Sequence, residues 1–174
     1  IKVTLNNDGT ATIIDNGRGI PIGIHPKAGI PAVEVVFTVL HAGGKFGDGG
    51  YKISGGLHGV GASVVNALSV WLEVEIKVDG GVYKQRYERG KAVAPLEKIG
   101  TCRKNDTGTK VTFLPDGEIF EKTRFKSDAI KSRMHETTYL NPGLTIHFED
   151  KRSGSEEKIT YSEPDGIKAY VKEL

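Results

Sequence analysis

The sheet of this protein is set by residues 70–78, which read Val70-Trp71-Leu72-Glu73-Val74-Glu75-Ile76-Lys77-Val78 and are followed by the turn Asp79-Gly80-Gly81. Apolar residues occupy every second position of this stretch. Successive side chains of a strand point to opposite faces of a sheet, so the alternation predicts a strand with one buried and one solvated face. The turn predicts that an antiparallel strand follows over residues 82–88.

Patterns on both sides of this hairpin extend the sheet and add helices. Further strands are predicted over residues 2–5 and 10–14, joined by the turn at 6–9, over 110–114, and over 143–149 and 157–162, joined by the turn at 151–154. Helical spacing predicts a helix over 32–41, with Val33, Val36, Phe37 and Leu40 on one stripe, and a helix over 126–139, with Ile130, Met134 and Thr137. An apolar helix is predicted to follow the glycine-rich residues 55–61, and a last one to include Ile167 and Leu174.

This order of elements predicts the fold class. Neighbouring strands joined by hairpins are antiparallel, and helices between strand pairs must bury their apolar stripes against the sheet. We therefore expect an α+β protein, a two-layer α/β sandwich with a mixed, mostly antiparallel sheet and helices on one face. Residues 1–174 are expected to form a single domain, and the start inside a strand suggests that it is truncated at its N-terminus.

Composition excludes several classes of function. Lys and Arg number 24 against 22 Asp and Glu, a net charge of +2, so nucleic-acid binding by this segment itself is not indicated. The single cysteine, Cys102, excludes a disulfide framework within the chain, and a cytoplasmic location is expected. No apolar run approaches the roughly 18 residues that a membrane span needs. The five histidines show no metal-ligand spacing; His58 lies in a glycine loop and the others are expected at the surface or at helix ends.

Two glycine-rich motifs suggest a nucleotide site. Residues 56–61, Gly56-Leu57-His58-Gly59-Val60-Gly61, precede the predicted apolar helix, whose first N–H groups and partial positive charge favour a phosphate. The spacing is neither that of a P-loop nor that of the dinucleotide-binding fingerprint. A flexible turn or close helix packing would explain this motif equally well.

The second motif is Asp15-Asn16-Gly17-Arg18-Gly19-Ile20-Pro21. An ionised carboxylate only accepts hydrogen bonds, so Asp15 can bind the exocyclic amine of adenine and would repel the carbonyl of guanine. Gly17 and Gly19 leave room for a flat ring, and Ile20 and Pro21 provide an apolar wall. A turn in which Asp15 caps local N–H groups remains an alternative. Thr109 can steady such a carboxylate, although a threonine at the start of a strand needs no special role.

Residues 15–21, 41–46 and 54–68 together resemble the ATPase domain of the B subunits of bacterial type II DNA topoisomerases, DNA gyrase and topoisomerase IV. That domain has the Bergerat fold of the GHKL superfamily, which includes histidine kinases, MutL and the large heat-shock chaperone. The first glycine motif fits the whole superfamily. The stretches His41-Ala42-Gly43-Gly44-Lys45-Phe46 and Ser54 to Leu68 are specific to the topoisomerase branch.

The resemblance implies a role for each matching residue. Asp15 would accept the adenine amine with Thr109 assisting through water, Gly17, Gly19, Ile20 and Pro21 would line the adenine pocket, and Arg18 would border it. Residues 43–54 would form a lid, with Lys45 near the phosphates. Backbone N–H groups of Gly56, Leu57, His58, Gly59, Val60, Gly61 and Ala62 would hold the phosphates. Aminocoumarin antibiotics bind this pocket in the family.

The resemblance also implies cofactors, partners and a limit. ATP with Mg²⁺ would be bound, and the full-length protein would act on DNA as a homodimer that joins two DNA-cleaving A subunits in an A2B2 complex, without a membrane. The family's catalytic glutamate and magnesium-binding asparagine precede the first strand seen here, so no general base or metal ligand can be assigned in this chain. Glu34 follows the adenine motif and does not match. We therefore expect no ATP turnover by this chain alone.

Three alternatives remain open at this stage. Topoisomerase IV would use the same pocket for decatenation, whereas gyrase would introduce negative supercoils. A chaperone or signalling kinase of the same superfamily is a second alternative, against which residues 41–46 argue. A non-catalytic interaction domain that kept the fold is the third, against which Asp15 and the unbroken glycine loop argue.

Overall fold

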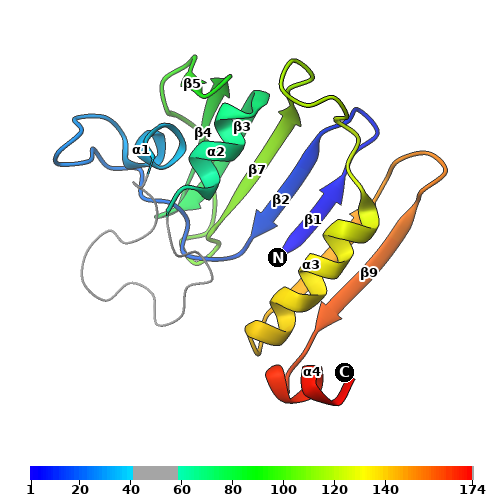
Figure 1. Ribbon diagram of the computed structural model, residues 1–174. Coiled ribbons are helices and arrows are strands. Elements are labelled where there is room, and N and C mark those ends of the chain that lie inside the picture. The colour runs from blue at the N-terminus through cyan, green and yellow to red at the C-terminus, as the bar shows by residue number, and fades with distance from the viewer. Residues whose placement is uncertain (41–58, 174) are drawn as a thin grey trace. The chain divides into compact units, whose positions relative to one another are not determined.

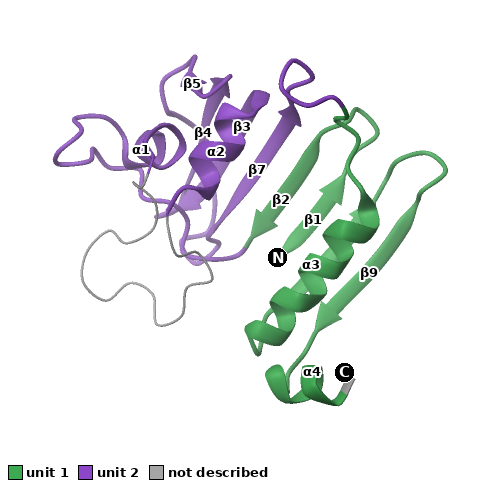
Figure 2. Ribbon diagram, viewed as in Figure 1, with its two compact units in different colours: residues 1–15, 122–174 green, residues 16–121 purple. Residues whose placement is uncertain are grey.

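The computed structural model describes residues 1–40 and 59–173, and it divides the chain into two compact units. Residues 1–15 and 122–174 make up unit 1, and residues 16–121 make up unit 2 (Figure 2). Both units combine antiparallel strands with helices, so the α+β class expected from the sequence is confirmed. No described helix has the length and apolar character needed to cross a membrane.

Unit 2 is built around the long strand β3 (Ser69–Val78), which lies between β4 (Gly81–Glu88) and β7 (Gly108–Pro115) and pairs antiparallel with both. The short strands β5 (Lys91–Ala92) and β6 (Glu97–Thr101), which the sequence did not predict, pair with β4. Helices α1 (Ala32–Thr38) and α2 (Gly61–Ala67) cover one face of this sheet (Figure 1).

The core of unit 2 confirms the alternation of residues 70–78. Leu72, Val74 and Ile76 are fully buried, and they pack with Val33 and Phe37 of α1 and with Tyr87 of β4. The opposite face of the sheet carries ion pairs, among them Lys84–Glu73 at 2.8 Å and Lys110–Glu75 at 2.6 Å. The strand therefore has the single buried face that its sequence predicts.

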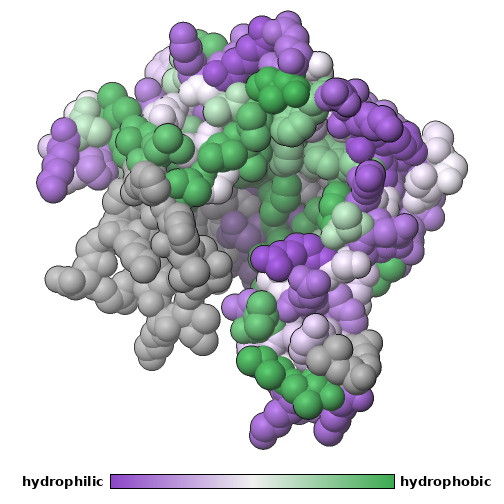
Figure 3. All heavy atoms as spheres, viewed as in Figure 1, coloured by the Kyte–Doolittle hydropathy of each residue, from purple (hydrophilic) through white to green (hydrophobic). Residues whose placement is uncertain are grey.

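Unit 1 contains four strands in the order β2-β1-β8-β9 and the helices α3 (Ser127–Leu140) and α4 (Ile167–Glu173). The strands β1 (Lys2–Leu5) and β2 (Ala11–Asp15) form the expected hairpin, as do β8 (Thr145–Asp150) and β9 (Glu157–Ser162). The pair of β1 and β8 is parallel, because the chain returns to β1 after a long connection that includes α3. Helix α3 packs on β8 and β9, and hydrophobic side chains gather at the surface over α4 (Figure 3).

Three details of the helices correct the sequence predictions. Helix α1 ends at Thr38 rather than near residue 41, because Val39 is extended, and Leu40 is 62% exposed instead of buried. On α3 the buried residues near the C-terminus are Thr138 and Tyr139 rather than Thr137. His135 lies within α3 rather than at its end, with its side chain 33% exposed; it is bonded to Glu163 at 3.0 Å, and its ring makes tilted contacts with those of Tyr139 and Tyr161.

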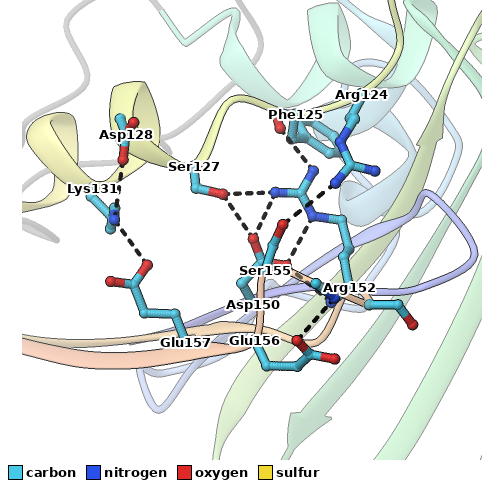
Figure 4. A network of polar contacts seen from close by, with 12 residues as sticks. Arg124, Phe125, Ser127, Asp128, Lys131, Asp150, Arg152, Ser155, Glu156 and Glu157 are labelled. Atoms are coloured by element: carbon cyan, nitrogen blue, oxygen red, sulfur yellow. Dashed lines mark hydrogen bonds and ion pairs between the residues drawn. The ribbon is translucent and has the colours of Figure 1, made fainter.

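The turn after β8 is tied to α3 by a buried arginine, which the sequence pattern did not reveal. Arg152 is 7% exposed and donates to both carboxylate oxygens of Asp150, from Nε at 2.8 Å and from Nη2 at 2.6 Å (Figure 4). It also donates to the Phe125 carbonyl at 2.8 Å and to Ser127 Oγ at 2.7 Å, at the start of α3. The Arg152 guanidinium holds the pKa of Asp150 well below its usual range.

Candidate functional site

Asp15, the residue expected to bind adenine, is the last residue of β2 and also the last residue of the N-terminal stretch of unit 1. Its side chain is partly buried, whereas the preceding Ile14 is 39% exposed. Strand β2 continues directly into residues 16–21, which open unit 2. The strand thus delivers a carboxylate to the start of the glycine turn, as its sequence position predicts.

The glycine turn at residues 17–21 packs against the end of β3 through Gly19. This residue has a φ of +80°, and a Cβ built on it would lie 2.8 Å from the Lys77 carbonyl oxygen and 3.3 Å from Ile76 Cγ2. A contact of 2.8 Å with backbone oxygen cannot be relieved by rotating a side chain, and the positive φ disfavours any other residue. Gly19 is therefore required both by its own conformation and by the close approach of two backbone segments.

Thr109 lies on the same part of unit 2. It is 9% exposed and sits directly opposite Ile76 in the register of β3 with β7, so Gly19 and Thr109 both flank Ile76. Ile20 packs against the core of this unit, whereas Pro21 and Arg18 lie at the surface. Within unit 2, two residues assigned to the adenine pocket, Gly19 and Thr109, thus lie next to Ile76, and a third, Ile20, packs on the core cluster that contains Ile76.

The second glycine motif enters α2. Gly59 has a φ of +61°, Val60 is the N-cap, and Gly61 is the first helical residue. A Cβ built on Gly61 would meet no described atom within 4 Å. Ala62 packs against the same core as Ile20. Lys45, Gly56, Leu57 and His58, also assigned to the site, lie outside the described residues.

Helix α2 is connected to α1 by a residue that the sequence analysis did not select. Asn66 is fully buried, and its Nδ2 donates to the Phe37 carbonyl at 2.8 Å, in the last turn of α1. The only hint in the sequence is that Asn66 is a polar residue within the apolar run Val64-Val65-Asn66-Ala67-Leu68. A single polar residue in such a run does not identify its partner.

The first turn of α1 is held by a second buried amide. Gln85 is 1% exposed, and its Nε2 donates to Glu34 Oε2 at 2.8 Å and to the Ala94 carbonyl at 3.1 Å. Its Oε1 accepts the Tyr87 hydroxyl at 2.8 Å, and burial followed by the nearby Glu34 charge raises the pKa of Tyr87. Glu34 thus links the first turn of α1 to β4 through Gln85.

These features define what the site can do chemically. Two glycine turns, at 17–21 and at 59–61, lie next to residues that pack on the core of unit 2, Ile20 for the first turn and Ala62 for the second. Such turns suit a flat ring and a phosphate chain respectively. Among the described residues no group of three or more His, Cys, Asp or Glu is arranged to hold a metal ion.

Comparison with known proteins shows the same architecture. Residues 1–119 match the family of histidine kinase-, DNA gyrase B- and HSP90-like ATPases. The chain is 58% identical to the DNA gyrase B protein of Thermotoga maritima and 57% identical to the B protein of DNA topoisomerase 4 from Streptococcus pneumoniae. In both comparisons the whole chain is aligned, and it spans 27% of the length of the relative.

Solved structures agree with these relatives. The 43K ATPase domain of Thermus thermophilus gyrase B, in complex with an aminocoumarin, superposes with a TM-score of 0.85 at 39% identity, over 99% of this chain and 42% of that one. The topoisomerase IV ATP-binding domain of Francisella tularensis, in complex with a small-molecule inhibitor, gives a TM-score of 0.83 at 37% identity, over 99% and 45%.

Proposed function

Because the chain belongs to the family of histidine kinase-, DNA gyrase B- and HSP90-like ATPases, we propose that it is the ATP-binding part of the B subunit of a bacterial type II DNA topoisomerase. The observation that carries the proposal is that Gly19 and Thr109 both lie next to Ile76, on the core against which Ile20 and Ala62 pack. B subunits of gyrase and of topoisomerase IV are among the relatives of this chain, at identities of 51–58%.

The proposed chemistry of binding follows from residue types. Asp15 accepts a hydrogen bond from the adenine amine, and Thr109 supports it through water. Gly17, Gly19, Ile20 and Pro21 leave a slot for the ring, and Arg18 borders that slot. Lys45 and the backbone N–H groups of residues 56–62 bind the phosphates, because such N–H groups donate to phosphate oxygens without the cost of reorganising a side chain.

This chain would bind ATP without itself supplying the group that breaks the phosphate bond. General-base activation of water needs a positioned carboxylate. Glu34, the acidic residue of α1, instead accepts a hydrogen bond from Gln85. Since the described residues offer no metal cluster, Mg²⁺ would enter with the nucleotide phosphates rather than through a site of these residues. In the full-length protein, ATP binding would close a dimeric clamp on DNA, and hydrolysis would reset it.

The relatives support two versions of this function about equally. A gyrase would form an A2B2 complex with its DNA-cleaving A subunit to introduce negative supercoils, whereas topoisomerase IV would decatenate linked circles with its own A subunit. Identities of 58% and 57% do not separate them. We favour gyrase, and supercoiling of relaxed plasmid by the full-length protein with its A subunit tests this choice, with decatenation as the competing outcome.

Calorimetric titration with novobiocin and with Mg-ATP, on wild type and on Asp15→Asn, tests the adenine site. An asparagine at this position would present a donor as well as an acceptor and would lose a charge-assisted hydrogen bond worth about 1.5–3 kcal/mol. We expect both ligands to bind wild type and to bind the variant at least about tenfold more weakly.

The matched control is Asp8→Asn, at the turn between β1 and β2, where Asp8 accepts from Thr10 Oγ1 at 2.6 Å. This variant should bind both ligands like wild type. Equal affinity of wild type and Asp15→Asn for both ligands would show that Asp15 does not bind adenine.

A further inference from the structure

Asn66 differs from the other buried amide of unit 2 in how its polar atoms are used. It is fully buried, its Nδ2 donates to the Phe37 carbonyl at 2.8 Å, and its Oδ1 has no hydrogen-bond partner among the described residues. The amide orientation is fixed by this contact, because the reversed orientation would place Oδ1 against another carbonyl oxygen. One half of the side chain is therefore bonded, and the other half is buried without compensation from the described part of the chain.

Gln85 provides the contrast. Its Nε2 donates to Glu34 and to the Ala94 carbonyl, and its Oε1 accepts the Tyr87 hydroxyl. A buried amide whose groups are all bonded stabilises the fold, whereas a buried acceptor without a donor offsets much of what its partner atom contributes. A gain in folding stability therefore explains why an amide is buried at Gln85, and it does not explain why one is buried at Asn66.

The location of Asn66 suggests what else it does. It lies four residues after Ala62, so the two side chains share one face of α2, and Ala62 directly follows the glycine turn at residues 59–61. The C-terminal end of α2 is held separately, because Ser69 Oγ donates to the Val65 carbonyl at 2.6 Å and Asp116 N donates to the Leu68 carbonyl at 3.0 Å. The bond from Asn66 to Phe37 adds a link from the body of α2 to the last turn of α1.

We propose that Asn66 is a positioning residue for phosphate binding: by bonding the Phe37 carbonyl it fixes α2, and with it the backbone of residues 59–62, relative to α1. This inference rests on the proposed function, since it requires that the turn at 59–62 binds nucleotide phosphates. Asn66 does not touch the nucleotide in this scheme. Its effect is confined to the phosphate half of the ligand, because Gly19 packs against β3 and Thr109 lies in β7 paired with β3.

The test compares two ligands that share the adenine ring. The full-length protein and the variants Asn66→Ala and Asn66→Thr are titrated with adenosine and with a non-hydrolysable ATP analogue. We expect the affinity for the analogue, and kcat/KM for ATP, to fall about tenfold in both variants, while adenosine binding changes less than about twofold. The matched control is Gln85→Ala, which should lower the unfolding temperature and leave the ratio of the two affinities unchanged.

Each other outcome has a distinct meaning. If both affinities fall by the same factor, or neither falls, Asn66 has no specific effect on the phosphates and the inference is wrong. If both Asn66 variants fail to give a cooperative unfolding transition, Asn66 is a structural residue and the inference is also wrong. If wild type binds neither ligand, the proposed function itself fails, which separates that failure from a failure of the inference.

Discussion

Replacing Arg152 with alanine should destabilise unit 1 more than any surface substitution near it. Arg152 makes four side-chain hydrogen bonds, two to Asp150, one to the Phe125 carbonyl and one to Ser127 Oγ, and both members of the ion pair are buried (Figure 4). The substitution would leave Asp150, which is 2% exposed, as a buried carboxylate with Ser127 and the backbone N–H of residue 152 as its remaining donors in this network.

The expected magnitude follows from that uncompensated charge. Removing one partner of a buried ion pair costs about 3–5 kcal/mol. For a chain of this size each kcal/mol lowers the unfolding temperature by about 2–4 °C, so the expected decrease is roughly 6–20 °C. Differential scanning calorimetry of the 174-residue chain measures it directly.

Two further variants make the result specific. The double variant Asp150→Asn with Arg152→Ala should cost less than the sum of the single variants, because no buried charge is then left unpaired. Arg124→Ala is the control, since Arg124 is exposed, contacts Ser155 at 3.5 Å in this network and should change stability by less than about 0.5 kcal/mol when replaced. A decrease below about 2 °C for Arg152→Ala would refute the reasoning.

Two other predictions concern pH and the glycine turn. Hydrogen bonds from Lys2 and, to a smaller extent, from Lys158 lower the pKa of Glu149 to about 2. A carboxyl whose pKa is lower in the folded state stabilises the fold above its unfolded pKa of about 4. That contribution is lost as the pH falls toward 2. The free energy of unfolding in urea should therefore decline over this window, and Glu149→Gln should flatten the decline; an unchanged profile would argue against the pairing. Gly19→Ala should destabilise unit 2 by about 1–3 kcal/mol and weaken nucleotide binding, because its Cβ would lie 2.8 Å from the Lys77 carbonyl at a φ of +80°. Gly23→Ala, where a Cβ would meet no described atom within 4 Å, should change neither quantity, and equal effects of the two substitutions would exclude close packing as the reason for Gly19.

The long periodic segments of the fold could be predicted from the sequence. The alternation of residues 70–78 determined the strand and its buried face, since a shift of one residue would bury Glu73 and Glu75. Strand β6 was missed because it has no such alternation, and its apolar residue Ile99 is 50% exposed. The helix predicted over residues 32–41 was too long because Leu40 fits the helical spacing. In the structure α1 ends at Thr38, and Leu40 remains largely exposed instead of packing on the core.

The site was predictable only where local backbone requirements appear in the sequence. Gly19 is visible as a glycine, and its φ of +80° and its close approach to the Lys77 carbonyl account for it, whereas no described contact requires a glycine at position 61. Asn66 and Gln85 were missed because their partners are the carbonyl of Phe37, 29 residues away, and the carboxylate of Glu34, 51 residues away. Side-chain hydrogen bonds over such separations leave no periodic signal in the sequence. For the same reason the sequence does not distinguish Arg152, which is buried, from an ordinary exposed residue of the turn at 151–154.

The placement of β3 between two long partners has a practical consequence for hydrogen-exchange experiments. Its backbone pairs over most of its length with β4 on one side and with β7 on the other, and Leu72, Val74 and Ile76 have no exposed surface. Amides bonded on both sides of a buried strand exchange only through large-scale opening, so peptides from β3 should be the slowest labelled in unit 2. These peptides can serve as an internal reference for global stability. If a nucleotide slows exchange at residues 59–62 and leaves exchange in β3 unchanged, the protection reports local binding rather than global stabilisation.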